Sequence, residues 1–185
     1  MTKFSVSING STYELPLKAI RTKTYGPNKG SKYVYVNPPI AGLLVKQFVK
    51  RNFPNVLCRV VSDSFSGGNS LRVYVSTKLG APIDSPTYKT ISDFVNMWEY
   101  GKFNGMIDMY ESYENSGAVS DNGLELEAGI KYAFTENQPR FGTVEWVVNE
   151  VRSGRTFNET VKYVDSKVAE KARVELSSYM SGVKI

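Results

Sequence analysis

The stretch from Pro39 to Thr77 constrains the fold more than any other part of this 185-residue chain. Leu44 and Phe48 recur at the spacing of one helical face, and Pro54 is typical of a helix end because proline disfavours helical backbone in the residue before it. The residues that follow form two segments of alternating apolar and polar side chains, separated by paired glycines that permit a tight turn. The stretch therefore predicts a helix followed by a β-hairpin, whose apolar faces the rest of the chain must cover.

The remaining segments predict more strands and helices around this unit. Asn9-Gly10 between alternating segments predicts a hairpin at the start of the chain. Residues 32–37 predict a strand, and the basic segment that precedes it, from residue 18, predicts a loop. Apolar residues recur at helical spacing in residues 91–98 and 141–151, which predicts two helices. A capping box at Thr156 and Glu159 predicts a longer helix after it. We expect a single α+β domain (residues 1–185), with a mainly antiparallel sheet of five or six strands and about four helices, residues 142–185 supplying the C-terminal ones.

The composition excludes several kinds of chemistry. The chain has no histidine and one cysteine, Cys58, which removes Ser–His–Asp and Cys–His catalysis, histidine-ligated metals and cysteine-based zinc sites. Carboxylates, lysines or tyrosines remain for catalysis, with or without a hard metal ion. We favour a non-enzymatic protein and expect no cofactor.

The sequence also bears on location. It has no run of about 18 apolar residues, so we expect no membrane-spanning helix. The first fifteen residues alternate between polar and apolar side chains, and they lack the apolar core of a signal peptide. A single cysteine fits a reducing compartment. A cytoplasmic location is therefore expected.

Charge is distributed unevenly along the chain, whose net charge is +5. Residues 1–60 hold ten lysines and arginines and one acid, whereas residues 61–127 hold four basic and ten acidic residues. A basic first third indicates a surface that binds a polyanion, although the acidic middle could also simply lie beside it within the same molecule.

The first candidate site is a basic and aromatic sheet face. Aromatic rings stack on any base, and cationic side chains beside them contact phosphates, so such a face suits single-stranded DNA or RNA. The interpretation requires the strands concerned to belong to one sheet that helices leave uncovered. The residues assigned to it are Arg59, Arg72, Tyr74, Tyr33 and Tyr35, with Lys46, Lys50 and Arg51 on the preceding helix.

The second candidate site is acidic. Asp108, Glu111 and Glu114 are spaced three residues apart, which on a helix would place three carboxylates on one face. Such a face could hold Mg²⁺ for phosphodiester cleavage. It could also be a solvated helix face, a docking patch for a basic protein partner, or a DNA mimic.

Two stretches carry a family resemblance: VKQFVKRNFPNVLCRVVSDSFSGGNSLRVYV and YGKFNGMIDMYE. Over residues 40–141 the chain resembles the twenty-ninth of the large polyvalent protein-associated domains, which occur in proteins of bacteriophages and conjugative elements. The family's second segment has an aspartate where this chain has Asn104. The resemblance implies a phage or mobile-element origin and a link to host entry or anti-defence, and it implies no agreed active site. For a phage-encoded protein, the expected cytoplasmic location is the cytoplasm of the host cell.

These observations lead to three functional hypotheses. The first is a non-enzymatic nucleic-acid-binding accessory protein of a phage or mobile element. The alternative is an inhibitor that binds a host defence or transcription protein through the acidic surface. The third is a metal-dependent nuclease.

Overall fold

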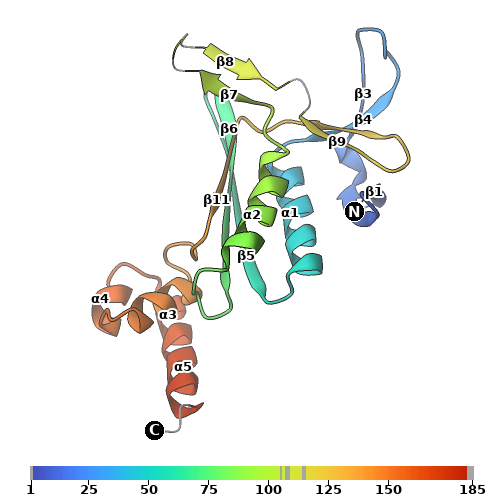
Figure 1. Ribbon diagram of the computed structural model, residues 1–185. Helices are drawn as coiled ribbons and strands as arrows, with labels where there is room; N and C mark the ends of the chain where they lie inside the picture. Colours follow the sequence, from blue (N-terminus) through green and yellow to red (C-terminus); the bar gives the residue numbers. More distant parts are fainter. Residues whose placement is uncertain (1, 105, 107–108, 114–115, 183–185) are drawn as a thin grey trace.

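Helix α1 (Pro38–Asn52) lies across one face of a three-stranded sheet in the computed structural model, which describes residues 2–104, 106, 109–113 and 116–182 (Figure 1). The strands of this sheet, which we call the central sheet, lie in the order β11 (Tyr132–Glu136), β6 (Gly68–Thr77), β5 (Val56–Phe65). Helix α2 (Ser85–Asn96) lies beside α1 on the same face. The helix and hairpin predicted from residues 39–77 are thus confirmed.

Local chemistry sets the bounds of α1. The side chain of Asn37 accepts a hydrogen bond from the Ile40 N–H at 3.2 Å, and two prolines occupy the first helical positions, where a missing N–H costs nothing. The helix packs closely on the central sheet at Gly42, where an added Cβ would lie 3.0 Å from a methyl group of Val60. One face of the central sheet is therefore covered, and we call the opposite one its outer face.

A second sheet has four strands, in the order β3 (Ile20–Thr22), β4 (Lys32–Val36), β10 (Glu125–Ala128), β9 (Gly117–Val119). Strands β4 and β10 pair in parallel, although about ninety residues separate them in the sequence. The loop predicted to begin at Lys18 instead includes the short 3₁₀ helix η1 (Leu17–Ala19) and β3. A strand of three residues is too short for alternation to reveal it.

Two hairpins complete the strands of the described residues. Strands β1 (Lys3–Ile8) and β2 (Ser11–Pro16) are joined by the predicted Asn9-Gly10 turn, whose positive φ angles of 50° and 71° suit these two residues. The carboxylate of Asp121 fastens this turn to the loop before β10, since it accepts from the Ser7 hydroxyl at 2.6 Å and from the Gly10 N–H at 3.0 Å. The second hairpin consists of β7 (Gly101–Asn104) and β8 (Met109–Ser112).

The C-terminal helices form a separate apolar cluster around Val147, Val148 and Ala172. The helices are α3 (Val144–Arg152), α4 (Phe157–Val161) and α5 (Ser166–Gly182). The capping box at Thr156 and Glu159 is confirmed, but the single longer helix is wrong. The side chain of Asp165 accepts from the Lys167 N–H at 2.9 Å and begins a new helix, so the segment divides in two.

The α+β class and the single domain are confirmed, but the predicted single sheet is not. The described strands are divided among sheets of four, three, two and two strands, and two of the pairings are parallel. The helices number five, besides η1, in the described part of the chain. No helix within the described ranges is long and apolar enough to cross a membrane.

Candidate nucleic-acid interface

The segment from Ile20 to Val36, which we call the arm, extends away from the helices as a ribbon (Figure 1). It comprises β3, β4 and the nine residues between them. Backbone hydrogen bonds continue beyond the strands, from the Lys23 N–H to the Ser31 carbonyl at 2.9 Å and from the Gly30 N–H to the Lys23 carbonyl at 2.8 Å. The ribbon is therefore held as a ladder for most of its length.

The arm is cationic throughout. It contains Arg21, Lys23, Lys29 and Lys32 and no acidic residue. Tyr25 lies in its connecting segment and is 88% exposed. Neither Lys29 nor Lys32 makes an ion pair with any described residue. Their charges thus face solvent.

Two tyrosines predicted for the interface lie at the base of the arm. Val34 and Val36 on β4 are fully buried, and the alternation of the strand turns Tyr33 and Tyr35 to the other, half-exposed face. The guanidinium carbon of Arg21 lies 4.2 Å from the ring centroid of Tyr35, and the ammonium of Lys23 lies 5.6 Å from that of Tyr33. Each ring therefore carries a cation beside it, in a cation–π contact.

The neighbouring strand brings two carboxylates to this face. In the parallel register of β10 with β4, Glu125 lies beside Tyr33 and Glu127 beside Tyr35. Glu125 accepts from Lys23 at 2.7 Å, and this hydrogen bond raises the pKa of the lysine. Glu127 makes no hydrogen bond or ion pair with the described residues, although its charge also contributes to the raised pKa of Lys23.

Three of the other predicted residues share the outer face of the central sheet. In the β5–β6 register Arg59 lies opposite Tyr74, and Arg72 lies two positions away on the same face of β6. This face is opposite the one that α1 covers. However, the requirement that Tyr33 and Tyr35 join them in one sheet fails, because those two rings belong to the four-stranded sheet.

Sequence reasoning missed further aromatic residues on this outer face. Phe134 lies beside Arg72 in the parallel β6–β11 register and is 44% exposed, and Phe65 is 47% exposed and stacks on Tyr132 with centroids 6.2 Å apart. The alternation of Tyr132 and Phe134 in the sequence indicates a shared face. Only the pairing of β11 with β6, across some sixty residues, places that face beside the arginines.

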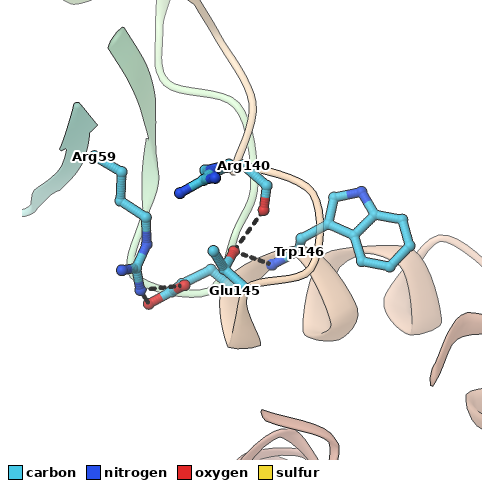
Figure 2. A network of polar contacts seen from close by, with 5 residues as sticks. Arg59, Arg140, Glu145 and Trp146 are labelled. Carbon is cyan, nitrogen blue, oxygen red and sulfur yellow. Dashed lines mark hydrogen bonds and ion pairs between the residues drawn. The ribbon is translucent and has the colours of Figure 1, made fainter. Parts of the chain in front are cut away.

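Both arginines of the outer face are already engaged within the molecule. One guanidinium nitrogen of Arg59 lies 2.7 Å from each carboxylate oxygen of Glu145, at the start of α3 (Figure 2). Arg72 lies 3.3 Å from Glu136 and 5.2 Å from the ring centroid of Phe134. Much of the positive charge expected on this face is therefore compensated by carboxylates.

The cations of α1 lie elsewhere. Lys46 and Lys50 are exposed, but they belong to the helix on the opposite side of the central sheet from Arg59 and Arg72. Arg51 binds the carbonyl of Thr12, and its guanidinium lies 5.2 Å from the ring centroid of Tyr13. It serves to hold the N-terminal hairpin on α1.

Of the acidic candidate site, only Glu111 lies within the described residues. Glu111 lies on strand β8 and accepts from the Asn104 side chain at 2.8 Å, so the expected helix face is wrong at this residue. Asn-Gly at 104–105 favours a hairpin turn over a helix. Asp108 and Glu114 lie outside the described residues, and the described ranges contain no group of three or more potential metal-ligating side chains. The inhibitor and nuclease hypotheses stay predictions.

Comparison of the chain with models of known families, with curated proteins and with solved structures found no significant match. The resemblance to the large polyvalent protein-associated domain, and the mobile-element origin that it implies, stay predictions.

Proposed function

We propose that the protein binds single-stranded nucleic acid through the arm, residues 20–36. The observation that carries this proposal is a projecting ribbon with four cationic side chains, no acid and an almost fully exposed tyrosine. Cations along such a ribbon neutralise phosphates, and exposed rings offer stacking partners for unpaired bases.

The arm supports the proposal better than the outer face of the central sheet does. Arg59 and Arg72 each have a carboxylate within 3.3 Å, and a phosphate would have to displace it. Lys29 and Lys32 have no such competitor among the described residues. Of the residues that the sequence predicts for the interface, we therefore retain Tyr33 and Tyr35, which lie in the arm. The cytoplasmic location stays a prediction.

Fluorescence anisotropy with a labelled single-stranded oligonucleotide tests the charge contribution. The double variant Lys29→Ala/Lys32→Ala should bind more weakly, and the slope of log affinity against log salt should fall by about 1.4, since each phosphate contact on a single strand contributes about 0.7. The matched control is Lys162→Ala/Lys171→Ala, which removes two exposed lysines of the C-terminal segment and should leave the slope unchanged. Equal effects of the two double variants would contradict the proposal.

A second variant separates stacking from charge. Tyr25→Ala should weaken binding by about 1–3 kcal/mol while leaving the salt slope unchanged, because the lost contact is with a base rather than a phosphate. Tyr163→Ala is the control, since Tyr163 is 76% exposed on the C-terminal segment.

A further inference from the structure

A cavity of about 320 Å³ lies where the base of the arm meets the β7–β8 hairpin. Its walls include three tyrosines, two serines and one carboxylate: Tyr35, Tyr100, Tyr113, Ser112, Ser116 and Glu127. Flat rings and a few convergent polar groups are typical of a site for a small planar ligand.

Backbone contacts position the residues that supply the aromatic walls. The ring of Tyr35 lies directly against Gly129, where an added Cβ would come within 2.7 Å of its Cζ atom. The Tyr100 N–H donates to the Ile130 carbonyl at 2.9 Å, and the Tyr113 N–H donates to the Tyr100 carbonyl at 2.8 Å. Backbone contacts therefore fix the positions from which Tyr100 and Tyr113 line the cavity, and Gly129 provides the space that the Tyr35 ring occupies.

Glu127 gives the cavity a chemical preference. It lies beside Tyr35 on β10, and no described residue provides it with a hydrogen bond or an ion pair. An ionised carboxylate can only accept, and its two oxygens match a ligand that presents two adjacent N–H donors.

We propose that this cavity binds one unstacked guanine base of the strand that the arm holds, an inference that rests on the proposed function. Guanine presents two neighbouring donors on its Watson–Crick edge, N1–H and the N2 amino group, and both can reach one carboxylate. Adenine, cytosine and thymine each place an acceptor beside their donor on that edge, and this acceptor is repelled by the carboxylate. Unpaired bases that are splayed out and stacked on aromatic side chains are read in this way.

The same lining could hold an organic cation between the rings, but Arg21 opposes this. Its guanidinium already lies 4.2 Å from the Tyr35 centroid, and the arm beside the cavity also carries Lys29 and Lys32, which make no ion pair with a described residue. A cationic side chain of a partner would enter against this charge, whereas a neutral base linked to a phosphate would be attracted.

The test compares oligonucleotides that differ at one base. An eleven-residue oligo-dT with a single central guanine should bind about tenfold more tightly than the same oligomer with thymine throughout. Hypoxanthine in place of guanine should lose most of this gain, because it lacks the N2 amino group. Glu127→Gln should remove the preference, while Glu125→Gln, the matched change two residues earlier on the same strand, should retain it.

The possible outcomes separate the two proposals. Equal, salt-dependent binding of the guanine and thymine oligomers would overturn the cavity assignment and leave the arm proposal standing. Absence of salt-dependent binding by any oligomer would overturn both. Chemical-shift changes at Glu127 and Tyr113 with methylguanidinium, but none with guanosine 5′-monophosphate, would identify a cation site and overturn the guanine assignment.

Discussion

The ring of Phe48 on α1 stacks face to face on the ring of Phe94 on α2, with centroids 4.0 Å apart and an angle of 3° between the planes. Tyr13 stacks on Phe94 at 6.0 Å, and Trp98 meets it edge-on at 5.8 Å. Phe94 therefore joins both helices of the central sheet to the N-terminal hairpin.

Replacing this ring should destabilise the whole domain. We expect Phe94→Ala to lower the free energy of unfolding by about 3 kcal/mol, because it removes three ring contacts and leaves a cavity. Tyr163→Ala, at a largely exposed ring, should change it by less than about 0.5 kcal/mol. Urea denaturation measures both values, and similar losses would refute the role assigned to Phe94.

The ion pair between Arg59 and Glu145 joins β5 to α3 (Figure 2). About half of the arginine side chain is exposed, so we expect a coupling energy of only about 0.2–1 kcal/mol. A double-mutant cycle of Arg59→Ala and Glu145→Ala measures this energy apart from the effect of Glu145 on its own helix end. The coupling energy should decline as salt is added, because salt screens the two charges. A coupling energy that salt does not change would show that it does not arise from this ion pair.

Gly80 is expected to be the least replaceable of the glycines with positive φ that adjoin α3. Its φ is +82°, and an added Cβ would lie 2.1 Å from the carbonyl oxygen of Glu145. Gly154 has a φ of +104° but open space around it, so Gly154→Ala should cost only the backbone strain, about 1 kcal/mol. Gly80→Ala should cost about 1–3 kcal/mol more. Thermal unfolding of the two variants checks the difference.

Glu99 should make stability depend on pH. Burial raises the pKa of its carboxyl above the ordinary 4.5, although the Ala133 N–H donates to it at 3.2 Å. The folded state therefore holds this proton more tightly than the unfolded state, and stability falls as pH rises from about the ordinary value through the folded pKa. Glu99→Gln keeps an acceptor for the N–H and removes the charge.

The variant Glu99→Gln should thus melt at a higher temperature than the original protein at pH 7, and the difference should vanish at a pH below the ordinary carboxyl value. Calorimetry between pH 3 and 8 measures this. Glu170→Gln, at an exposed position on α5, is the control. A variant that melts lower at pH 7 would contradict the assigned cost of the buried charge.

The elements that the sequence predicts well are those whose signals are local. The helix after Asn37, the turn at Asn9-Gly10 and the capping box at Thr156 each depend on residues within four positions of one another. Such patterns favour a particular backbone conformation whatever the rest of the chain does.

The features that sequence reasoning missed depend on distant pairing. Nothing near Phe134 shows that it will lie beside Arg72, and nothing near Tyr35 shows that β10 will bring Glu127 next to it. The division into separate sheets follows from these parallel registers, and so does the position of Glu136 near Arg72. The carboxylate that pairs with Arg59 comes instead from Glu145 at the start of α3, about 86 residues further along the chain. A single sequence contains no local signal for a parallel partner, which the chain reaches only through a long crossover.

The two parallel pairings also have a consequence during synthesis. Strand β4 is complete after residue 36 and β6 after residue 77, but their partners β10 and β11 lie at residues 125–128 and 132–136. During synthesis, one edge of β4 and one edge of β6 therefore stay unpaired until the last third of the chain has been made. Forming these contacts closes long loops, which is slow. A product truncated before residue 125 would keep those edges open and would be prone to aggregate.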